Sequence, residues 1–470
     1  MSQQIQAQDL IDLGYPKNHI LGIALQMNKK RHGFTRAKMI QYYIHVLLSP
    51  DAFVEDVVFR PLALALLKKE DPGLIAMRDI GNNYPCFGAE FIEEGARAQM
   101  DVAMRLPVTV AGALMPDAHQ GYGLPIGGVL AADNAVIPYG VGVDIGCRMA
   151  LTVFELTPDD FADDKSHYAD MLTKQTLFGA GQGYNGIERS EHAVLDRSEF
   201  GLKPFIKNLQ DKAWSQLGTS GGGNHFVEWG ILDFAIADDI LGIPAGKYVA
   251  LLSHSGSRGL GASIANHYTA LAREVCKLPR EAVHLAYFSL DSELGHEYWA
   301  AMNLAGDYAS ACHEIIHKKL IKQLGAKVLA RVENHHNFAW KEQHDGRDLI
   351  VHRKGATPAG LGVMGIIPGS MTAEGFLVRG RGEETSLNSA AHGAGRQMSR
   401  TKAEATYSRQ DMLQVLQENE VKLIGGGIDE IPMAYKNIHQ VMSAQQNLVD
   451  IVASFQPKIV RMADDGSRED

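Results

Sequence analysis

The chain has 470 residues, of which 45% are hydrophobic and 21% charged, a composition typical of a globular protein with a sizeable core. The net charge of −10 argues against non-specific wrapping of long nucleic acid, but it is compatible with a local pocket for one phosphate group or one strand end. No apolar run approaches the ~18 residues of a membrane span, and four widely spaced cysteines without a CxxC pair indicate a reducing, cytoplasmic location rather than a disulfide framework.

Residues 1–75 are predicted to form a helical N-terminal extension. Apolar residues recur at helical spacing in HILGIALQMNKK (19–30) and in MIQYYIHVLL (39–48). A Ser-Pro-Asp turn at 49–51 then precedes a third predicted helix, VVFRPLALALLKK (57–69).

From about residue 80 the pattern changes to short apolar strands broken by glycine-rich loops. Clear examples are VTVAGALM (108–115), GGVLAA (127–132), YVALLS (248–253) and KVLARVE (327–333). Helices are interspersed, and the chain contains neither periodic repeats nor a low-complexity linker. Residues 80–470 are therefore predicted to form one large α+β domain.

Several histidines lie in loops beside or between these predicted strands. His254 follows YVALLS, His336 follows KVLARVE, His225 follows the glycine run TSGGGN, and His392 opens the loop HGAGR. A lone histidine at a strand end is usually a hydrogen-bonded or solvated side chain, but strand-end loops of one sheet can converge on one pocket. Imidazole groups together with a carboxylate and a thiolate suit a borderline transition metal such as Zn, Mn, Co or Fe.

The stretch GVGVDIGCRM (140–149) supplies both missing ligand types. It places Asp144 and Cys147 three positions apart on nearly bare backbone, and a thiolate at position 147 could bridge two metal ions. The alternative is that Cys147 is a small buried apolar residue, as free cysteines often are. The spacing by itself leaves both interpretations open.

Two further motifs resemble known functional patterns, and each also has an ordinary structural interpretation. His313-Glu314-Ile-Ile-His317 fits the HExxH of zinc hydrolases, whereas the amphipathic helix around it would make both histidines ordinary residues of its polar face. The glycine-rich stretch 179–186 is a near miss to a dinucleotide-binding fingerprint. It lacks a following helix in the sequence pattern, so we expect a loop there.

Taken together, the motifs resemble the RtcB-type RNA-splicing ligases. The resemblance covers roughly residues 80–460, with every motif in family order: MPDAHQGYGLPIGGV (115–129), GVGVDIGC (140–147), LGTSGGGNHFVE (217–228), SHSGSRG (253–259), HHN (335–337), IPGSM (367–371), HGAGR (392–396) and DEIPMAYKN (429–437). It implies a single large RtcB-like domain of mixed sheets and helices around a dinuclear metal pocket.

The resemblance also implies an activity and a set of site residues. Such enzymes join an RNA 3′-phosphate or 2′,3′-cyclic phosphate end to a 5′-hydroxyl end, with GTP as co-substrate and two Mn(II) ions. His392 would attack GTP and carry the guanylate. One ion would be held by Asp144, Cys147 and His225, and the other by Cys147, His254 and His336. The guanylate would be contacted by Asn224, Phe226, Glu228, Asn337, Pro368, Gly369, Ser370, Met371, Gly375, Gly393, Ala394, Gly395 and Tyr435.

Three more residues are assigned by their chemistry and position in these motifs. Asp117 could fix the tautomer of His392 through a ring nitrogen. Arg258 and Arg396 could grip phosphate in bidentate fashion, or could be solvated surface arginines. The expected partners are GTP and RNA ends, without a membrane, and a monomer is favoured.

The chain departs from the family pattern at several positions. Met462 falls where a guanylate-contacting lysine is common, Gly375 where a serine contact is usual, and Arg148 where a glycine is common. Because the implied ligands and nucleophile are intact, ligase chemistry is the favoured prediction. A catalytically weakened paralogue that binds RNA ends, and a zinc hydrolase that uses His313 and His317, are the alternatives.

Overall fold

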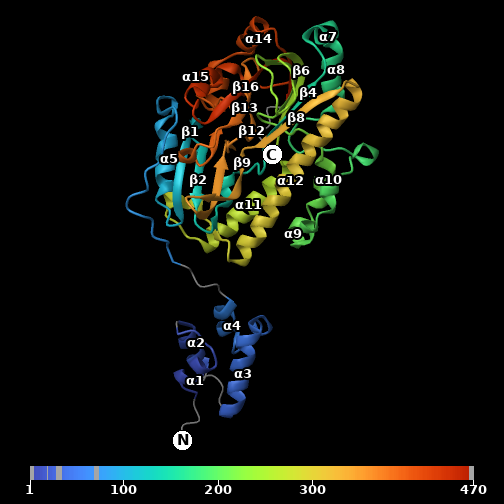
Figure 1. Cartoon of the computed structure of the whole chain (residues 1–470). Coiled ribbons are helices and arrows are strands. Elements are labelled where there is room, and N and C mark those ends of the chain that lie inside the picture. The colour runs from blue at the N-terminus through green and yellow to red at the C-terminus, as the bar shows by residue number, and fades with distance from the viewer. Residues whose placement is uncertain (1–4, 18, 28–33, 68–72, 465–470) are drawn as a thin grey trace. The chain divides into compact units, whose positions relative to one another are not determined.

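The computed structural model describes residues 5–17, 19–27, 34–67 and 73–464 (Figure 1). The chain divides into two compact units, Met1–Gly73 and Leu74–Asp470. The mixture of helices and strands in the second unit confirms the predicted α+β class.

The first unit is a small helical bundle with its own apolar core. Tyr43 is fully buried in this core, and its hydroxyl donates a 2.7 Å hydrogen bond to the carbonyl of Ala24, which ties two helices together. Thr35 caps the longest helix by accepting a hydrogen bond from the Lys38 amide. Positions 28–30 and 68–69 of the predicted helices lie outside the described residues. The helices are α1 (Ala7–Asp12), α2 (His19–Met27), α3 (Arg36–Leu48) and α4 (Arg60–Leu67), with a 3-10 turn at Pro50–Phe53.

The second unit is organised around an eight-stranded sheet in the order β12-β13-β16-β5-β6-β4-β8, with β15 paired in parallel to β16 and all other neighbours antiparallel. The sheet curls toward a barrel, so that its two end strands, β12 and β8, come into contact. The Ile366 amide of β12 donates a 3.0 Å hydrogen bond to the side chain of Asn334 on β8. Its strands are β4 (Arg148–Phe154), β5 (Phe226–Phe234), β6 (Gly246–Ser255), β8 (Val328–His335), β12 (Met364–Ile367), β13 (Gly375–Gly380), β15 (Lys422–Ile424) and β16 (Val449–Met462).

Strand alternation gives this sheet two different buried faces. Met149, Leu151 and Leu252 point to the inner face, where they pack with one another inside the curled sheet. Phe154 and Leu251, which have the opposite parity, pack against helices on the outer face. Burying each such side chain contributes roughly 1.5–3 kcal/mol, so a register slip of one residue would be strongly disfavoured.

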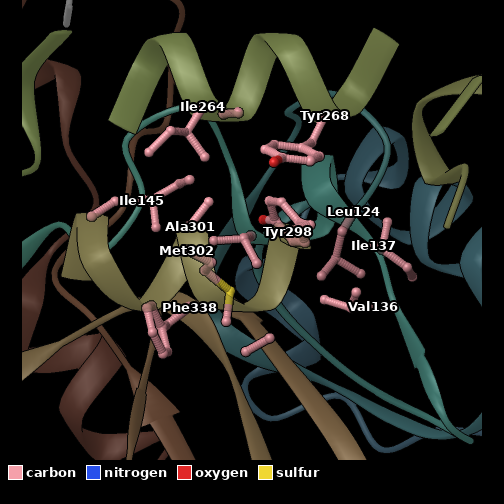
Figure 2. Packing of buried hydrophobic residues seen from close by; sticks show 14 of the residues in the cluster. Leu124, Val136, Ile137, Ile145, Ile264, Tyr268, Tyr298, Ala301, Met302 and Phe338 are labelled. Atoms are coloured by element: carbon pink, nitrogen blue, oxygen red, sulfur yellow. The ribbon is translucent and has the colours of Figure 1, made fainter. Parts of the chain in front are cut away.

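Two long helices, α11 (Arg258–Val275) and α12 (Glu293–Leu324), form the largest core of the unit. Figure 2 shows Ile264 and Tyr268 of α11 facing Tyr298 and Ala301 of α12. Ser292 caps the start of α12, and Gly325 ends it in the left-handed conformation. The remaining α-helices are α5 (Glu94–Met104), α6 (Pro138–Val141), α7 (Pro158–Asp163), α8 (Lys165–Gln175), α9 (Pro204–Lys207), α10 (Gln210–Gln216), α13 (Arg400–Thr406), α14 (Arg409–Glu418) and α15 (Ile438–Ser443).

Smaller sheets complete the unit. A four-stranded antiparallel sheet has the order β1-β2-β10-β9, and β11 pairs with β14 and β3 with β7. These strands are β1 (Thr109–His119), β2 (Ile126–Ala132), β3 (Ala135–Val136), β7 (Phe288–Ser289), β9 (Asn337–His344), β10 (Arg347–Lys354), β11 (Ala356–Pro358) and β14 (Ser389–Ala391). Among the described residues, none of the helices combines the length and apolar character that crossing a membrane requires.

Candidate metal and nucleotide site

Four of the predicted ligands lie at one edge of four adjacent strands. In the order β5-β6-β4-β8, His225 precedes β5, His254 lies near the end of β6, Cys147 precedes β4 and His336 follows β8. Because neighbouring strands are antiparallel, the start of one and the end of the next meet at the same edge. The sheet therefore gathers side chains that are up to 189 positions apart in the sequence.

The ligand atoms of this cluster are close together and buried. The Cys147 thiol lies 3.1 Å from Nε2 of His254 and 3.5 Å from Nε2 of His225. Nε2 of His254 lies 3.2 Å from Nε2 of His336. The ligand atoms of Cys147, His225 and His254 all lie within 4.8 Å of one another. Thiolate and imidazole at these separations match the donors that surround a single transition-metal ion, where bonds of about 2.0–2.3 Å place ligand atoms roughly 3–4 Å apart.

Asp144 extends the cluster on the side of His225. Its carboxylate accepts a 3.0 Å hydrogen bond from the Ser257 amide, and the second oxygen lies 3.0 Å from Nε2 of His225. Burial opposes ionisation of Asp144, but the hydrogen bond from His225, together with the Arg258 guanidinium, outweighs it and holds the pKa of Asp144 below its usual range. The carboxylate is therefore ionised and available to a cation.

His254 and His336 are neutral, so each can offer a ring-nitrogen lone pair to a metal. Burial in the cluster lowers the pKa of His254 and of His336 well below the usual value. Nδ1 of His254 lies 3.2 Å from the Asn224 carbonyl and donates to it, which leaves the lone pair of Nε2 facing Cys147 and His336. These residues therefore fit a transition metal by donor type, spacing and protonation.

Arg258 lies behind the ligand cluster, where it is only 1% exposed. Its guanidinium donates a 2.9 Å hydrogen bond to Nδ1 of His225, so the proton of that ring lies on Nε2, toward Asp144. A cation bound at Nε2 of His225 needs the other neutral tautomer, with the proton on Nδ1, so its binding would require Arg258 to give up this hydrogen bond. Arg258 is therefore not a solvated surface arginine, and a phosphate-binding role for it stays a prediction.

His392 lies beside the cluster and is held by Asp117. Nδ1 and the backbone amide of His392 lie 2.6 and 3.1 Å from the same Asp117 oxygen. Asp117 is fully buried, whereas the His392 side chain is 18% exposed. The His392 ring also lies 5.0 Å, centroid to centroid, from the ring of His336. Because Nδ1–H donates to Asp117, the lone pair of Nε2 is left available for chemistry.

A cavity of about 630 Å³ opens over His254, His336 and His392. One wall is the inner face of the large sheet, where strand alternation places Phe226 and Glu228 beside His254. The other predicted guanylate contacts that line it are Asn224, Pro368, Gly369, Ser370, Met371, Gly375, Gly393, Ala394, Gly395 and Tyr435. Asn337 instead braces the ligand loop: its side chain donates to the Asp144 carbonyl at 3.3 Å and accepts from the Gly355 amide at 2.8 Å.

The far wall of the cavity carries a paired charge cluster. Arg396 donates to the Asp429 carbonyl at 2.6 Å, and its guanidinium lies over the Tyr435 ring at 5.2 Å. Glu430 hydrogen-bonds the Tyr435 hydroxyl and forms ion pairs with Arg396 and Arg400. Burial raises the pKa of Glu430 above its usual range, and it raises the pKa of Glu228 well above it. Glu430 and Arg400 were not singled out from the sequence, although Glu430 lies inside the quoted motif DEIPMAYKN.

The histidines of the HEIIH motif occupy a different environment from the one predicted. Both are fully buried in α12, so the interpretation that they are ordinary residues of the helix's polar face is wrong. The hydroxyl of Ser253 lies 2.6 Å from Nδ1 of His313 and 2.8 Å from Nε2 of His317. The other ring nitrogens contact the Ser255 carbonyl and the Thr152 hydroxyl. With all four nitrogens engaged in hydrogen bonds between α12 and the sheet, the pair is structural.

The remaining sequence predictions concern the glycine-rich stretch and the neighbour of Cys147. Residues 179–186 form a loop that leads into a three-residue 3-10 helix, Gly186–Glu188, as expected for a stretch without a dinucleotide fold. Arg148 forms a buried ion pair with Glu333 and donates hydrogen bonds to the carbonyls of Gly146 and Gly306 at 3.1 and 2.7 Å. It thereby fastens the Cys147 loop to α12, a role with no signal in the local sequence.

Comparison with known proteins gives the site its context. The sequence profile of the family described as "tRNA-splicing ligase RtcB" matches residues 99–463. The chain is 33% identical over 388 residues to the RNA-splicing ligase RtcB of Escherichia coli, covering 77% of this chain and 92% of the relative. It is 33% identical over 419 residues to the tRNA-splicing ligase RtcB of Nanoarchaeum equitans (74% and 87%), and 30% identical over 483 residues to the RNA-splicing ligase RtcB homolog 1 of Entamoeba dispar (87% and 86%). The chain belongs to the RtcB family.

Proposed function

We propose that this chain is a GTP- and manganese-dependent RNA ligase that joins a 3′-phosphate or 2′,3′-cyclic phosphate end to a 5′-hydroxyl end. Family membership supports the RNA ligase class. The observation that carries the finer proposal is the convergence of His392, His254 and His336 on one cavity large enough for a nucleotide.

His392 is the proposed nucleophile toward the α-phosphate of GTP. A neutral imidazole attacks phosphorus well: a P–N bond would form as the α–β phosphoanhydride of GTP breaks and pyrophosphate leaves. The resulting phosphoramidate is reactive enough to pass guanylate to an RNA 3′-phosphate, with the P–N bond to His392 broken in that transfer. Asp117 supports this role, since its carboxylate accepts a hydrogen bond from Nδ1–H of His392 and so orients the ring. Transfer of guanylate to the RNA phosphate converts a poor electrophile into an activated ester, from which the 5′-hydroxyl displaces GMP.

The proposed metal ligands form two overlapping triads. Asp144, Cys147 and His225 would hold one ion, and Cys147, His254 and His336 the other, with the thiolate shared. When bound, Mn(II) supplies positive charge that neutralises phosphate oxygens and favours in-line displacement. The chain's own contribution is to keep the donors deprotonated, close together and out of bulk water.

Recognition of the guanine base is assigned to the sheet wall of the cavity. Glu228 is buried there, and the groups at a guanine edge include an N2 amino donor that a carboxylate can accept. Burial raises the pKa of Glu228 well above its usual range, and a donor at the guanine edge would favour its charged form. Phe226 lines the same wall and offers an aromatic surface to the nucleotide.

The test is ligation of an RNA pair that bears a 2′,3′-cyclic phosphate and a 5′-hydroxyl, with GTP and Mn(II). Wild type should give joined product, His392→Ala should give none, and the control His167→Ala, which removes an exposed histidine on α8, should match wild type. Absence of joined product and of any guanylated protein in the wild type would refute the proposal.

A second candidate is an RNA-end-binding protein without turnover. The observation that favours it is Met462, which lines the cavity where the resemblance places a lysine, so one guanylate-binding cation is missing. This candidate predicts RNA-end affinity without a covalent guanylate and without ligation in Mn(II). The same assay separates the two.

A further inference from the structure

Tyr122 is an exposed aromatic residue at the rim of the cavity. It lies in the loop between β1 and β2 and is 65% exposed, yet it lines the same cavity as His392. A single exposed apolar side chain is ordinary on a protein surface, but this aromatic ring also borders the cavity into which His392 opens. The feature therefore points to a ligand.

The backbone around Tyr122 is fixed from both sides. The Gln99 side chain of α5 donates to the Gly121 carbonyl at 2.5 Å and accepts from the Gly121 amide at 3.0 Å. The Lys354 ammonium donates a 2.7 Å hydrogen bond to the carbonyl of Tyr122 itself. The ring is thus presented by a tethered loop, and little backbone entropy would be lost when something stacks on it.

The Tyr122 ring packs against the side chain of His284. The two ring centroids lie 5.7 Å apart at 48°, and His284 in turn lies 5.3 Å from the ring of Tyr139. Gly123 makes this approach possible: it adopts φ +70°, and a Cβ there would lie 3.0 Å from Cβ of His284. The supported ring keeps an orientation while most of the residue stays accessible.

The charges beside the loop are of both signs, the Glu93 carboxylate and the Lys354 ammonium, so charge alone does not recruit a phosphate there. Glu93 lines the same part of the cavity and accepts a 2.6 Å hydrogen bond from the Gln120 amide. A carboxylate at this position repels phosphate oxygens, whereas a nucleobase presents an uncharged π-face to the ring.

We propose that Tyr122 is a stacking platform for a nucleobase of the RNA strand whose end enters the cavity beside His392. The inference rests on the proposed function, and it adds a base contact to the phosphate and sugar chemistry at the joint. Stacking of this kind is tolerant of sequence, because every base has a π-face. The platform therefore provides grip on an RNA end without requiring a particular sequence.

The test is equilibrium binding of two short labelled RNAs, one with a 3′-phosphate and one with a 5′-hydroxyl, measured by fluorescence anisotropy with the full-length protein. Tyr122→Ala should weaken binding of at least one of them by about 5- to 150-fold, the equivalent of one lost base stack. Tyr122→Phe keeps the ring and should bind as wild type does. The control Leu361→Ala removes a side chain that is 85% exposed, and it should leave binding unchanged.

An abasic nucleotide in the RNA separates stacking from a structural effect. When the terminal base of the affected strand is removed, wild type and Tyr122→Ala should bind with equal affinity. Equal affinity of wild type and Tyr122→Ala for both intact RNAs would overturn the inference, as would an undiminished difference on abasic RNA. Because binding needs no turnover, this result stands apart from the guanylation and ligation assays that test the proposed function.

Discussion

Asp117→Asn tests how His392 is prepared for reaction. In the wild type, one Asp117 oxygen receives both the ring Nδ1–H and the backbone amide of His392, at 2.6 and 3.1 Å. Because both donors converge on a single oxygen, the asparagine carbonyl can occupy the same position. The substitution therefore preserves shape and removes the negative charge.

The expected loss follows from the difference between charged and neutral hydrogen bonds. A hydrogen bond to a charged group contributes about 1.5–3 kcal/mol and a neutral one about 0.5–1.5 kcal/mol. The Asp117 side chain is fully buried, so solvent does not screen this difference. The imidazole gains positive charge as it attacks phosphorus, and the substitution should weaken the stabilisation of that charge by about 1–2 kcal/mol. The guanylation rate should therefore fall roughly 5- to 30-fold.

Single-turnover guanylation with labelled GTP and Mn(II) measures this rate directly. The concentration of GTP that gives half-maximal rate should stay unchanged, since Asp117 is assigned to the nucleophile and not to the nucleotide. Asp133→Asn, which neutralises an exposed carboxylate that pairs with Arg347, is the matched control. A rate for Asp117→Asn equal to that of this control would refute the positioning role.

Three further perturbations have defined outcomes. Arg148→Met releases the Cys147 loop from Glu333, and it should weaken Mn(II) affinity about 10-fold in a chelator competition; unchanged affinity would contradict the clamp. Gly395→Ala should abolish guanylation, because the new Cβ would lie 2.2 Å from the Asp117 carbonyl oxygen at φ +71°; normal guanylation would contradict this packing. Burial lowers the pKa of His313 to about 4, so between pH 6.5 and 4 the unfolded chain holds a proton that the folded chain lacks, and stability falls as the pH is lowered. His313→Gln removes that dependence. In urea titrations the variant should be less stable than wild type at pH 6.5, and this difference in unfolding free energy should shrink by about 2 kcal/mol when the pH is lowered to 5. A difference that stays constant with pH would show that His313 is not buried in its neutral form.

The sequence was sufficient where local pattern determines structure. The short apolar run YVALLS predicted β6, and the position of His254 near its end followed from that strand alone. The alternation of side chains along a strand separates His254, on the cavity face, from Ser253, which faces α12 and binds His313. Motif order then supplied the family, which the comparisons confirm.

Contacts between distant segments could not be obtained in this way. The ion pair of Arg148 joins residues 185 positions apart, and the strand order that brings Cys147 next to His254 depends on the whole sheet. His313 and His317 were misplaced because their polar partners lie on strands far away in sequence. Arg258 lies only four residues after His254. Its backbone adopts φ +54° where α11 begins, and the guanidinium lies behind His225, which the local sequence did not indicate.

The attachment site of the nucleotide tests the whole account most directly. After incubation with GTP and Mn(II), peptide mapping by mass spectrometry should find one guanylate on the peptide that contains His392, lost on acid treatment and stable in alkali. Guanylate on a different residue, or a protein that carries none although its metal site is filled, would contradict the account.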